Sequence, residues 1–234
     1  MAPSVTVITL LTERRQFIDL LTACINLQDY DRSSIEWLIV DDSGVEIPDF
    51  KEAAIQPLYV SLSQKQTLGR KRNIACSIAN GEFITFFDDD DIHYPGRITA
   101  GIEALTKRGQ RFIAGSSEME MVELASGKIY KDGPYNSKHA TAGTFFFRKQ
   151  MLEGTSFRDS DVAGEEAHFL KNYSIPMHQL KKEQSIICIG HEQNTVSKKK
   201  FYTAEKFSGN IIERELPSEI MCEFEKLQGS LNIE

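Results

Sequence analysis

The sequence predicts an α/β protein with a mostly parallel central sheet and helices on both faces. Strand-like and helix-like segments alternate over the first 115 residues, which is the pattern of βαβ units. Two of the expected strands also run directly into acidic residues, at Asp41 and Asp88. The carboxyl ends of parallel strands meet at one edge of a sheet, and ligands bind there. We therefore expect the functional site at that edge.

The expected strands are short apolar runs rich in β-branched and aromatic residues. In the N-terminal half they lie at 5–11, 37–40, 58–62, 83–87 and 112–115. Helices are expected between them at 17–27, at 67–79 with Thr67 as N-cap, and from 95 to 107. The less regular second half has a hairpin of 119–124 and 129–130, a strand at 145–147, a helix at 167–172 and a last strand at 185–189.

Composition narrows the class of protein. With 234 residues, of which 41% are hydrophobic and 26% charged, the chain can bury a sizeable core. The net charge of -7 argues against a general nucleic-acid surface, so no nucleic-acid partner is expected. The four cysteines form no CxxC pair, which argues against zinc and favours a reducing compartment. No run reaches 18 apolar residues, so we expect no transmembrane segment and a cytoplasmic location.

The most informative stretch is the aspartate run Asp88-Asp89-Asp90-Asp91, which directly follows an apolar strand. Four adjacent carboxylates at a buried strand end repel one another, which drives some of them to take up protons. Mg²⁺ or Mn²⁺ removes this conflict, because both ions prefer carboxylate oxygen. If the strand pleat continues, Asp88 and Asp90 share one face, and Asp89 and Asp91 the other. The alternative is a solvated acidic turn.

Neither of the glycine-rich phosphate loops GxxxxGK[ST] and GxGxxG is present, so a diphosphate would need a metal ion and side chains instead. The segments VTVITLLTERRQF, WLIVDDSG and LGRKRNIACSIANGEFITFFDDDDIHYPGRI occur in this order. This combination resembles the nucleotide-sugar-binding half of family 2 glycosyltransferases, which have the GT-A fold. The resemblance is good over residues 4–100 and weaker to 197.

The resemblance implies donor-binding roles for the first loop and the acidic pair. The start of the first loop would border the nucleobase and ribose, which makes Thr9, Leu11 and Glu13 candidates. Asp41, the first residue of the acidic pair, would contact the nucleobase of the donor. Arg72 would approach the donor or hold the aspartates, because arginine binds phosphate and carboxylate through two nitrogens. The neighbouring basic residues Lys65, Arg70 and Lys71 are expected to face solvent.

The aspartate run matches the DxD motif of the resembled family. Asp88 and Asp89 are therefore assigned to the donor, whereas the metal is assigned to Asp90 or Asp91. His191 follows the last expected strand, where many GT-A enzymes have a histidine that helps to bind metal or diphosphate. The alternative for His191 is a surface or packing residue.

The resemblance also implies the catalytic base. Inverting transfer needs a base opposite the departing diphosphate, and the family supplies it from a Glu-Asp pair before a short helix. This sequence has Glu165-Glu166, and we assign the base to Glu166 with Glu165 as the rival. Without the resemblance, such a pair would simply complement a helix dipole.

Together these features predict an inverting glycosyltransferase that uses Mn²⁺ or Mg²⁺ and a nucleotide-diphosphate sugar, with UDP as the expected nucleotide. The acceptor would be a glycan, a protein or a lipid-linked molecule. A catalytic domain is expected over 1–200, with a nucleotide-sugar-binding half at 1–100 and an acceptor and catalytic half at 101–200, followed by a helical tail at 201–234. The run Lys198-Lys199-Lys200 is interpreted as solvated, although contact with the diphosphate, an anionic acceptor or a membrane surface stays open.

Two other functions would fit part of these features. A sugar-phosphate nucleotidyltransferase would also use an α/β sheet and acidic metal ligands, but it normally has a glycine-rich loop after its first strand. Here that loop is Thr12-Glu13-Arg14-Arg15, without glycine. The second alternative is a non-catalytic module that binds a nucleotide sugar or a metal ion.

Overall fold

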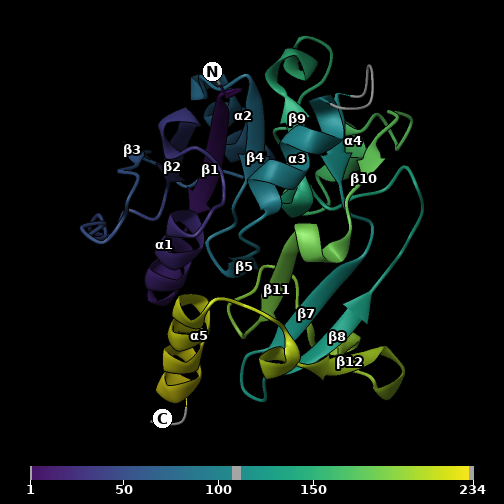
Figure 1. The fold of residues 1–234 in the computed structure, drawn as a ribbon. Coiled ribbons are helices and arrows are strands. Elements are labelled where there is room, and N and C mark those ends of the chain that lie inside the picture. The colour runs from purple at the N-terminus through teal and green to yellow at the C-terminus, as the bar shows by residue number, and fades with distance from the viewer. Residues whose placement is uncertain (1, 107–111, 232–234) are drawn as a thin grey trace.

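The computed structural model describes residues 2–106 and 112–231, with two sheets and helices packed around them (Figure 1). In these ranges, the seven strands of the first sheet follow in the order β10 (His178–Gln179), β6 (Ile113–Gly115), β9 (Phe146–Arg148), β4 (Phe83–Phe86), β1 (Val5–Leu11), β2 (Ile35–Asp41) and β3 (Leu58–Ser61). The five strands described for the second sheet follow in the order β12 (Phe207–Asn210), β8 (Lys128–Asp132), β7 (Met119–Glu123), β11 (Ile186–Gly190) and β5 (Asp91–His93).

The helices are short. The α-helices are α1 (Ile18–Asn26), α2 (Leu68–Ile78), α3 (Arg97–Thr106), α4 (Glu166–Phe169) and α5 (Ser218–Leu231). Single 3-10 turns lie at Arg15–Phe17, Arg32–Ser34, Ala142–Thr144, Lys149–Glu153, Lys182–Gln184, Lys199–Phe201, Ala204–Lys206 and Ile211–Glu213. Among the described residues, no helix is long and apolar enough to span a bilayer.

Helices cover both faces of the first sheet, which confirms the expected α/β class. Along β1, Val5, Val7 and Leu11 join one apolar cluster that contains residues of α1 and α3. Ile8 and Leu10 point to the opposite face and join a cluster that contains residues of α2 and α4. Because both faces are buried, the strand is a continuous apolar run in the sequence.

The first sheet is mostly parallel, as expected. β1 pairs in parallel with β2 and β4, and β2 pairs in parallel with β3. The exception is β9, which runs antiparallel between β4 and β6. The carboxyl ends of β1, β2 and β4 therefore lie side by side.

The second sheet was not predicted. The last strand, predicted at 185–189, is β11, which pairs in parallel with β7 and antiparallel with β5 and so belongs to this second sheet. β5 is only three residues long and begins with an aspartate, so no apolar run marks it in the sequence. This pairing brings β11 directly beside the end of the aspartate run.

The C-terminal segment is part of the folded core. It was expected to be helical, but β12 adds a strand that pairs antiparallel with β8. α5 contacts α1, below which it lies in Figure 1, and both helices contribute to an apolar cluster with β5, β7 and β11. α1 is therefore buried on two sides: Leu21 and Ile25 face the first sheet, whereas Leu20 and Cys24 face this second cluster.

A buried ion-pair group ties the C-terminal segment to the second sheet. Glu120 on β7 is only 1% exposed. It accepts hydrogen bonds from Lys182 Nζ at 2.6 Å and from Arg214 Nε and Nη2 at 3.0 and 2.7 Å. Burial would raise the pKa of Glu120, but the hydrogen bonds from Arg214 and Lys182 outweigh it and lower the pKa below its ordinary value of 4.5.

We expect Glu120→Gln to lower the free energy of unfolding by about 2 kcal/mol at neutral pH. This is less than for a fully buried pair, because Lys182 and Arg214 are partly exposed. A lowered pKa stabilises the fold above 4.5, and this contribution is lost as the pH falls through the folded-state pKa. The difference from wild type should therefore disappear in acid.

Urea unfolding at several pH values measures both effects, with the exposed Glu225→Gln on α5 as control. A difference of the same size at acidic and neutral pH would contradict the role of the Glu120 charge.

Candidate active site

The carboxyl ends of β1, β2 and β4 open onto a cavity of about 570 Å³. Its lining includes the aspartate run 88–91, the start of α2, the loop 162–166 and the segment 194–198. The cavity therefore lies at the sheet edge that the sequence predicts. It brings the aspartates together with the Glu165-Glu166 pair, which lies far away in the sequence.

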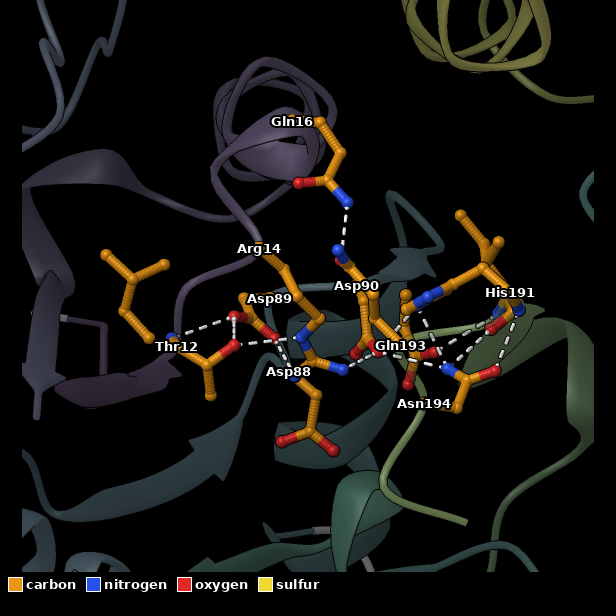
Figure 2. Close-up of polar contacts among 12 residues, drawn as sticks. Thr12, Arg14, Gln16, Asp88, Asp89, Asp90, His191, Gln193 and Asn194 are labelled. Atoms are coloured by element: carbon orange, nitrogen blue, oxygen red, sulfur yellow. Dashed lines mark hydrogen bonds and ion pairs between the residues drawn. The ribbon is translucent and has the colours of Figure 1, made fainter. Parts of the chain in front are cut away.

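The aspartate run does not continue the strand. β4 ends at Phe86, and the chain turns at Asp89 and Asp90, so the alternation expected from a continued pleat is wrong. Both carboxylates instead meet the guanidinium of Arg14, which donates through Nη2 to Asp89 and through Nη1 to Asp90 (Figure 2). Asp89 also accepts from the backbone N–H and the hydroxyl of Thr12, at 3.0 and 3.1 Å.

The outer two aspartates have different surroundings. Asp88 Oδ1 lies 3.6 Å from Arg72 Nη2. The other carboxylate oxygen lies so close to Gly143 that a Cβ added there would be only 2.7 Å from it. Asp91 is the first residue of β5 and is buried, and its carboxylate accepts from the backbone N–H of Ile189 at 3.2 Å. Asp91, one of the two aspartates assigned to the metal, is thus held by β11.

Burial and like charge shift the pKa values of the run. Burial raises the pKa of Asp89 to about 7, because the charge of Arg14 offsets it only in part. Burial and the charge of Asp90 raise the pKa of Asp91 well above its ordinary value of 3.8. Burial would also raise the pKa of Asp90, but the hydrogen bond from His191 and the charge of Arg14 lower it. Asp90 is therefore more readily ionised than Asp89 or Asp91.

His191 reaches the aspartates from the end of β11. Its Nε2 lies 3.0 Å from Asp90 Oδ2 (Figure 2). Its ring packs on Phe17, with the ring centroids 4.6 Å apart. Asn194 accepts from the backbone N–H of His191 at 2.8 Å and donates to the same Asp90 oxygen at 3.2 Å. Two of the three residues assigned to the metal, Asp90 and His191, are thus in contact.

The acidic pair at the end of β2 is held by two basic side chains and a tyrosine hydroxyl. Asp41 accepts from Arg15 Nη2 at 2.6 Å and from the hydroxyl of Tyr59. Burial would raise the pKa of Asp41, but these hydrogen bonds lower it. Asp42 accepts from Lys71 Nζ at 2.5 Å, and this pair is buried. Of the two aspartates, Asp42 lines the cavity.

The candidates in the first loop lie beside the cavity, not in its lining. Thr9 and Leu11 are completely buried in the sheet, where the hydroxyl of Thr9 accepts a hydrogen bond from a tryptophan indole. Glu13 is exposed and forms an ion pair with a lysine. Among the residues of this segment, the lining includes Thr12 and Arg14.

Arg72 lies on α2 and contacts the carboxylates of Asp88 and Glu165, which belong to two other segments. Its Nε donates to Glu165 Oε1 at 2.7 Å, and its guanidinium lies over the ring of Phe86, 4.3 Å from the centroid. Among the described residues, no basic side chain forms an ion pair with Glu166, which begins α4 and lines the same cavity. Burial raises the pKa of Glu166 above its ordinary value of 4.5. The two glutamates therefore differ: Glu165 is paired and Glu166 is not.

Three contacting residues were not predicted from the sequence: Arg14, Lys71 and Asn194. Lys71 was expected to face solvent, but it is only 4% exposed. One signal could have found it, because an aspartate pair at a buried strand end needs counter-charges and α2 carries three basic residues in a row. Nothing in the sequence indicates that Asn194 turns back onto Asp90.

The chemistry of Asp90 and His191 fits a divalent cation, since a carboxylate oxygen and an imidazole nitrogen lie 3.0 Å apart. The guanidinium of Arg14 is a cation already bound to that carboxylate. Within 2–106 and 112–231, no group of three His, Cys, Asp or Glu side chains is arranged to hold a metal ion. A metal ion here would need further oxygen ligands from a bound molecule or water.

The sequence matches a known family over most of the first sheet and over the aspartate run. The sequence model described as Glycosyl transferase family 2 matches residues 6–156. A GalNAc(5)-diNAcBac-PP-undecaprenol beta-1,3-glucosyltransferase of Campylobacter jejuni is 24% identical over 168 residues, which are 63% of this chain and 53% of the relative. The chain therefore spans about half the length of this relative.

Solved structures of similar fold are glycosyltransferases or bind nucleotide sugars. The mannosyltransferase PcManGT from Pyrobaculum calidifontis, in complex with GDP-Man and Mn2+, has a TM-score of 0.61 and 17% identity, over 86% of this chain and 59% of that one. S. aureus TarS 1-349 in complex with UDP-GlcNAc has a TM-score of 0.58 and 16% identity, over 82% and 60%. At these identities, the likeness shows a shared fold.

We expect Lys71→Met to lower the free energy of unfolding by about 3 kcal/mol, because it leaves Asp42 buried without its counter-charge. The double variant Lys71→Met/Asp42→Asn should lose less than the sum of the two single variants. Urea unfolding measures this, with the exposed Lys65→Met as control. Strictly additive losses would mean that the two side chains are not coupled.

Proposed function

Because the chain belongs to glycosyl transferase family 2, we propose that it is an inverting glycosyltransferase. It transfers a sugar from a nucleotide-diphosphate sugar to an acceptor hydroxyl, with a UDP-sugar as the expected donor and with a divalent metal. The observation that carries the proposal is the shared cavity. The aspartate run and Glu165-Glu166 line the same space, so the groups proposed to bind the donor and the proposed base would reach one bound molecule.

The environment of the two glutamates favours Glu166 as the base. Glu165 is paired with the buried guanidinium of Arg72, so its carboxylate already has a partner. Glu166 has a raised pKa, caused mainly by burial, and is therefore the better proton acceptor. In the proposed step, the acceptor hydroxyl gives its proton to Glu166 and its oxygen bonds to the anomeric carbon. The bond to the diphosphate breaks, and its electron pair leaves with the nucleotide.

The basic and acidic groups near the aspartates support binding of a diphosphate. Asp90 and His191 would hold the metal ion, and Asp91 is the third residue assigned to it. When bound, the metal would stabilise the charge that develops on the departing diphosphate. Lys198 lines the same cavity, although Lys199 and Lys200 are exposed. Lys198 therefore adds a positive charge to the cavity near the aspartate run.

Donor and acceptor classes follow from the relatives as proposals. TarS binds UDP-GlcNAc and PcManGT binds GDP-Man with Mn2+, so both nucleotides belong in a first binding screen. The Campylobacter jejuni relative is named for an acceptor linked to PP-undecaprenol. A lipid-linked acceptor is therefore the first to test, followed by free glycans and proteins.

Purified protein should release UDP from a UDP-sugar in the presence of Mn²⁺, and faster with an acceptor. We expect Glu166→Gln to lower this turnover by about 10² or more, the usual scale for a positioned base, with little change in donor affinity. Glu165→Gln should keep more activity than Glu166→Gln. The exposed Glu153→Gln serves as a control for loss of a surface charge.

The outcomes separate the alternatives. If Glu165→Gln is the inactive variant, the two glutamates have the opposite order. Full activity in both variants would contradict the inverting mechanism at this position. Formation of a nucleotide sugar from UTP and a sugar phosphate would instead indicate a nucleotidyltransferase.

The contact between His191 and Asp90 supports a second prediction. His191→Ala should weaken binding of the Mn²⁺–UDP pair more than binding of Mn²⁺ alone, and should cost more activity at low than at saturating Mn²⁺. Asp90→Ala, which removes the carboxylate itself, should abolish metal-dependent UDP binding. Calorimetry and a Mn²⁺ titration of activity measure both. Wild-type activity of His191→Ala at every Mn²⁺ concentration would make His191 a packing residue against Phe17.

A further inference from the structure

Arg14 lies where the aspartates would bind a cation. Its guanidinium bridges Asp89 and Asp90, and its Nε donates to Thr12 Oγ1 at 2.9 Å (Figure 2). The side chain is only 14% exposed, yet it lines the cavity. Burial would lower the pKa of Arg14, but the charge of Asp89 and its neighbours raises it, so the guanidinium stays charged.

A metal ion held by both Asp90 and His191 would compete with this guanidinium for the same carboxylate oxygen. Asp90 Oδ2 accepts from Arg14, from His191 Nε2 at 3.0 Å and from Asn194 Nδ2 at 3.2 Å. Nitrogen donors therefore surround this oxygen on several sides. A divalent ion at Asp90 would also repel the adjacent positive guanidinium at short range. Arg14 must leave Asp90 before a metal ion binds there.

The surroundings allow Arg14 to leave. Arg14 lies in the turn between β1 and the 3-10 turn Arg15–Phe17, so its side chain can rotate without breaking a strand or an α-helix. Asp89 would keep both hydrogen bonds from Thr12. The freed guanidinium would remain at the cavity, where it can form paired hydrogen bonds to phosphate oxygens.

We propose that Arg14 is the resident cation of the aspartate site, and that it changes partners when the substrate binds. In the free protein it neutralises Asp89 and Asp90. When a metal ion takes Asp90, Arg14 moves to the diphosphate of the donor. This inference rests on the proposed function, because it needs a diphosphate ligand that binds together with a metal ion.

The exchange makes binding of metal and nucleotide cooperative. A metal ion alone must displace Arg14 from Asp90, one of its two carboxylates, and it places a second positive charge close to the guanidinium. A diphosphate gives Arg14 a new anionic partner and so favours metal binding. By linkage, the metal ion must then favour the diphosphate by the same factor. Arg14 therefore sets how strongly each ligand depends on the other.

Calorimetry with Mn²⁺ alone, with UDP alone and with both tests this exchange. Arg14→Gln should bind Mn²⁺ alone about tenfold more tightly than wild type, within the usual range of coupling between ligands. At saturating Mn²⁺ it should bind UDP about tenfold more weakly, because the phosphate contact is lost. Arg14→Lys, which keeps the charge, should bind Mn²⁺ alone as weakly as wild type. The exposed Arg32→Gln is the matched control and should change neither affinity.

Thermal unfolding gives a second readout that needs no nucleotide and no activity. Mn²⁺ alone should raise the Tm of Arg14→Gln more than that of wild type, because ligands stabilise the state that binds them. Mn²⁺ binding by Arg14→Gln that is unchanged or weaker than in wild type overturns the proposal. If Arg14→Gln does not fold, Mn²⁺ binding by Arg14→Lys that is tighter than in wild type overturns it. Failure of the proposed function gives a different result, since wild type then binds no UDP at any Mn²⁺ concentration.

Discussion

The site depends on the neutralisation of carboxylates crowded at one edge of the sheet. Acidic residues follow β2 and β4 and precede α4, and most of them are buried. An unpaired charge in such a position would shift its pKa or destabilise the fold. The buried or largely buried pairs that prevent this are Arg14 with Asp89 and Asp90, Lys71 with Asp42, and Arg72 with Glu165. Each cation comes from a different segment than its carboxylate, so the pairs also fix the segments around the cavity.

The second sheet and α1 pack next to this edge, where residues of α1, β5 and β11 share one apolar cluster. β5 follows the aspartate turn directly, and its pairing with β11 carries His191 to Asp90. Beneath them, the fully buried Arg97 donates to the carbonyls of Phe86 and Gly143, both at 2.6 Å. Burial lowers the pKa of Arg97 to about 10, although the nearby aspartates raise it. The guanidinium of Arg97 is therefore a further positive charge close to the aspartate run.

Pairing also gives chemically equivalent neighbours different properties. Glu165 and Glu166 are adjacent glutamates, but only Glu165 contacts Arg72. Asp89 and Asp90 share Arg14, yet the pKa of Asp89 is raised and that of Asp90 is lowered. The difference arises because Asp90 also receives the hydrogen bond from His191. Identical residues in one run therefore differ in pKa and in pairing because of the cations and hydrogen-bond donors around them.

The sequence by itself determined the α/β class, the order of the main strands and the edge at which the site lies. These follow from local patterns, namely runs of apolar residues and acidic residues at strand ends. Only the tertiary structure decided which cation meets which carboxylate. The paired residues are 29, 76 and 93 positions apart for Lys71–Asp42, Arg14–Asp90 and Arg72–Glu165. Spacing along the chain carries no information about such pairs, because Coulombic and hydrogen-bond energies depend on distances in space that packing sets.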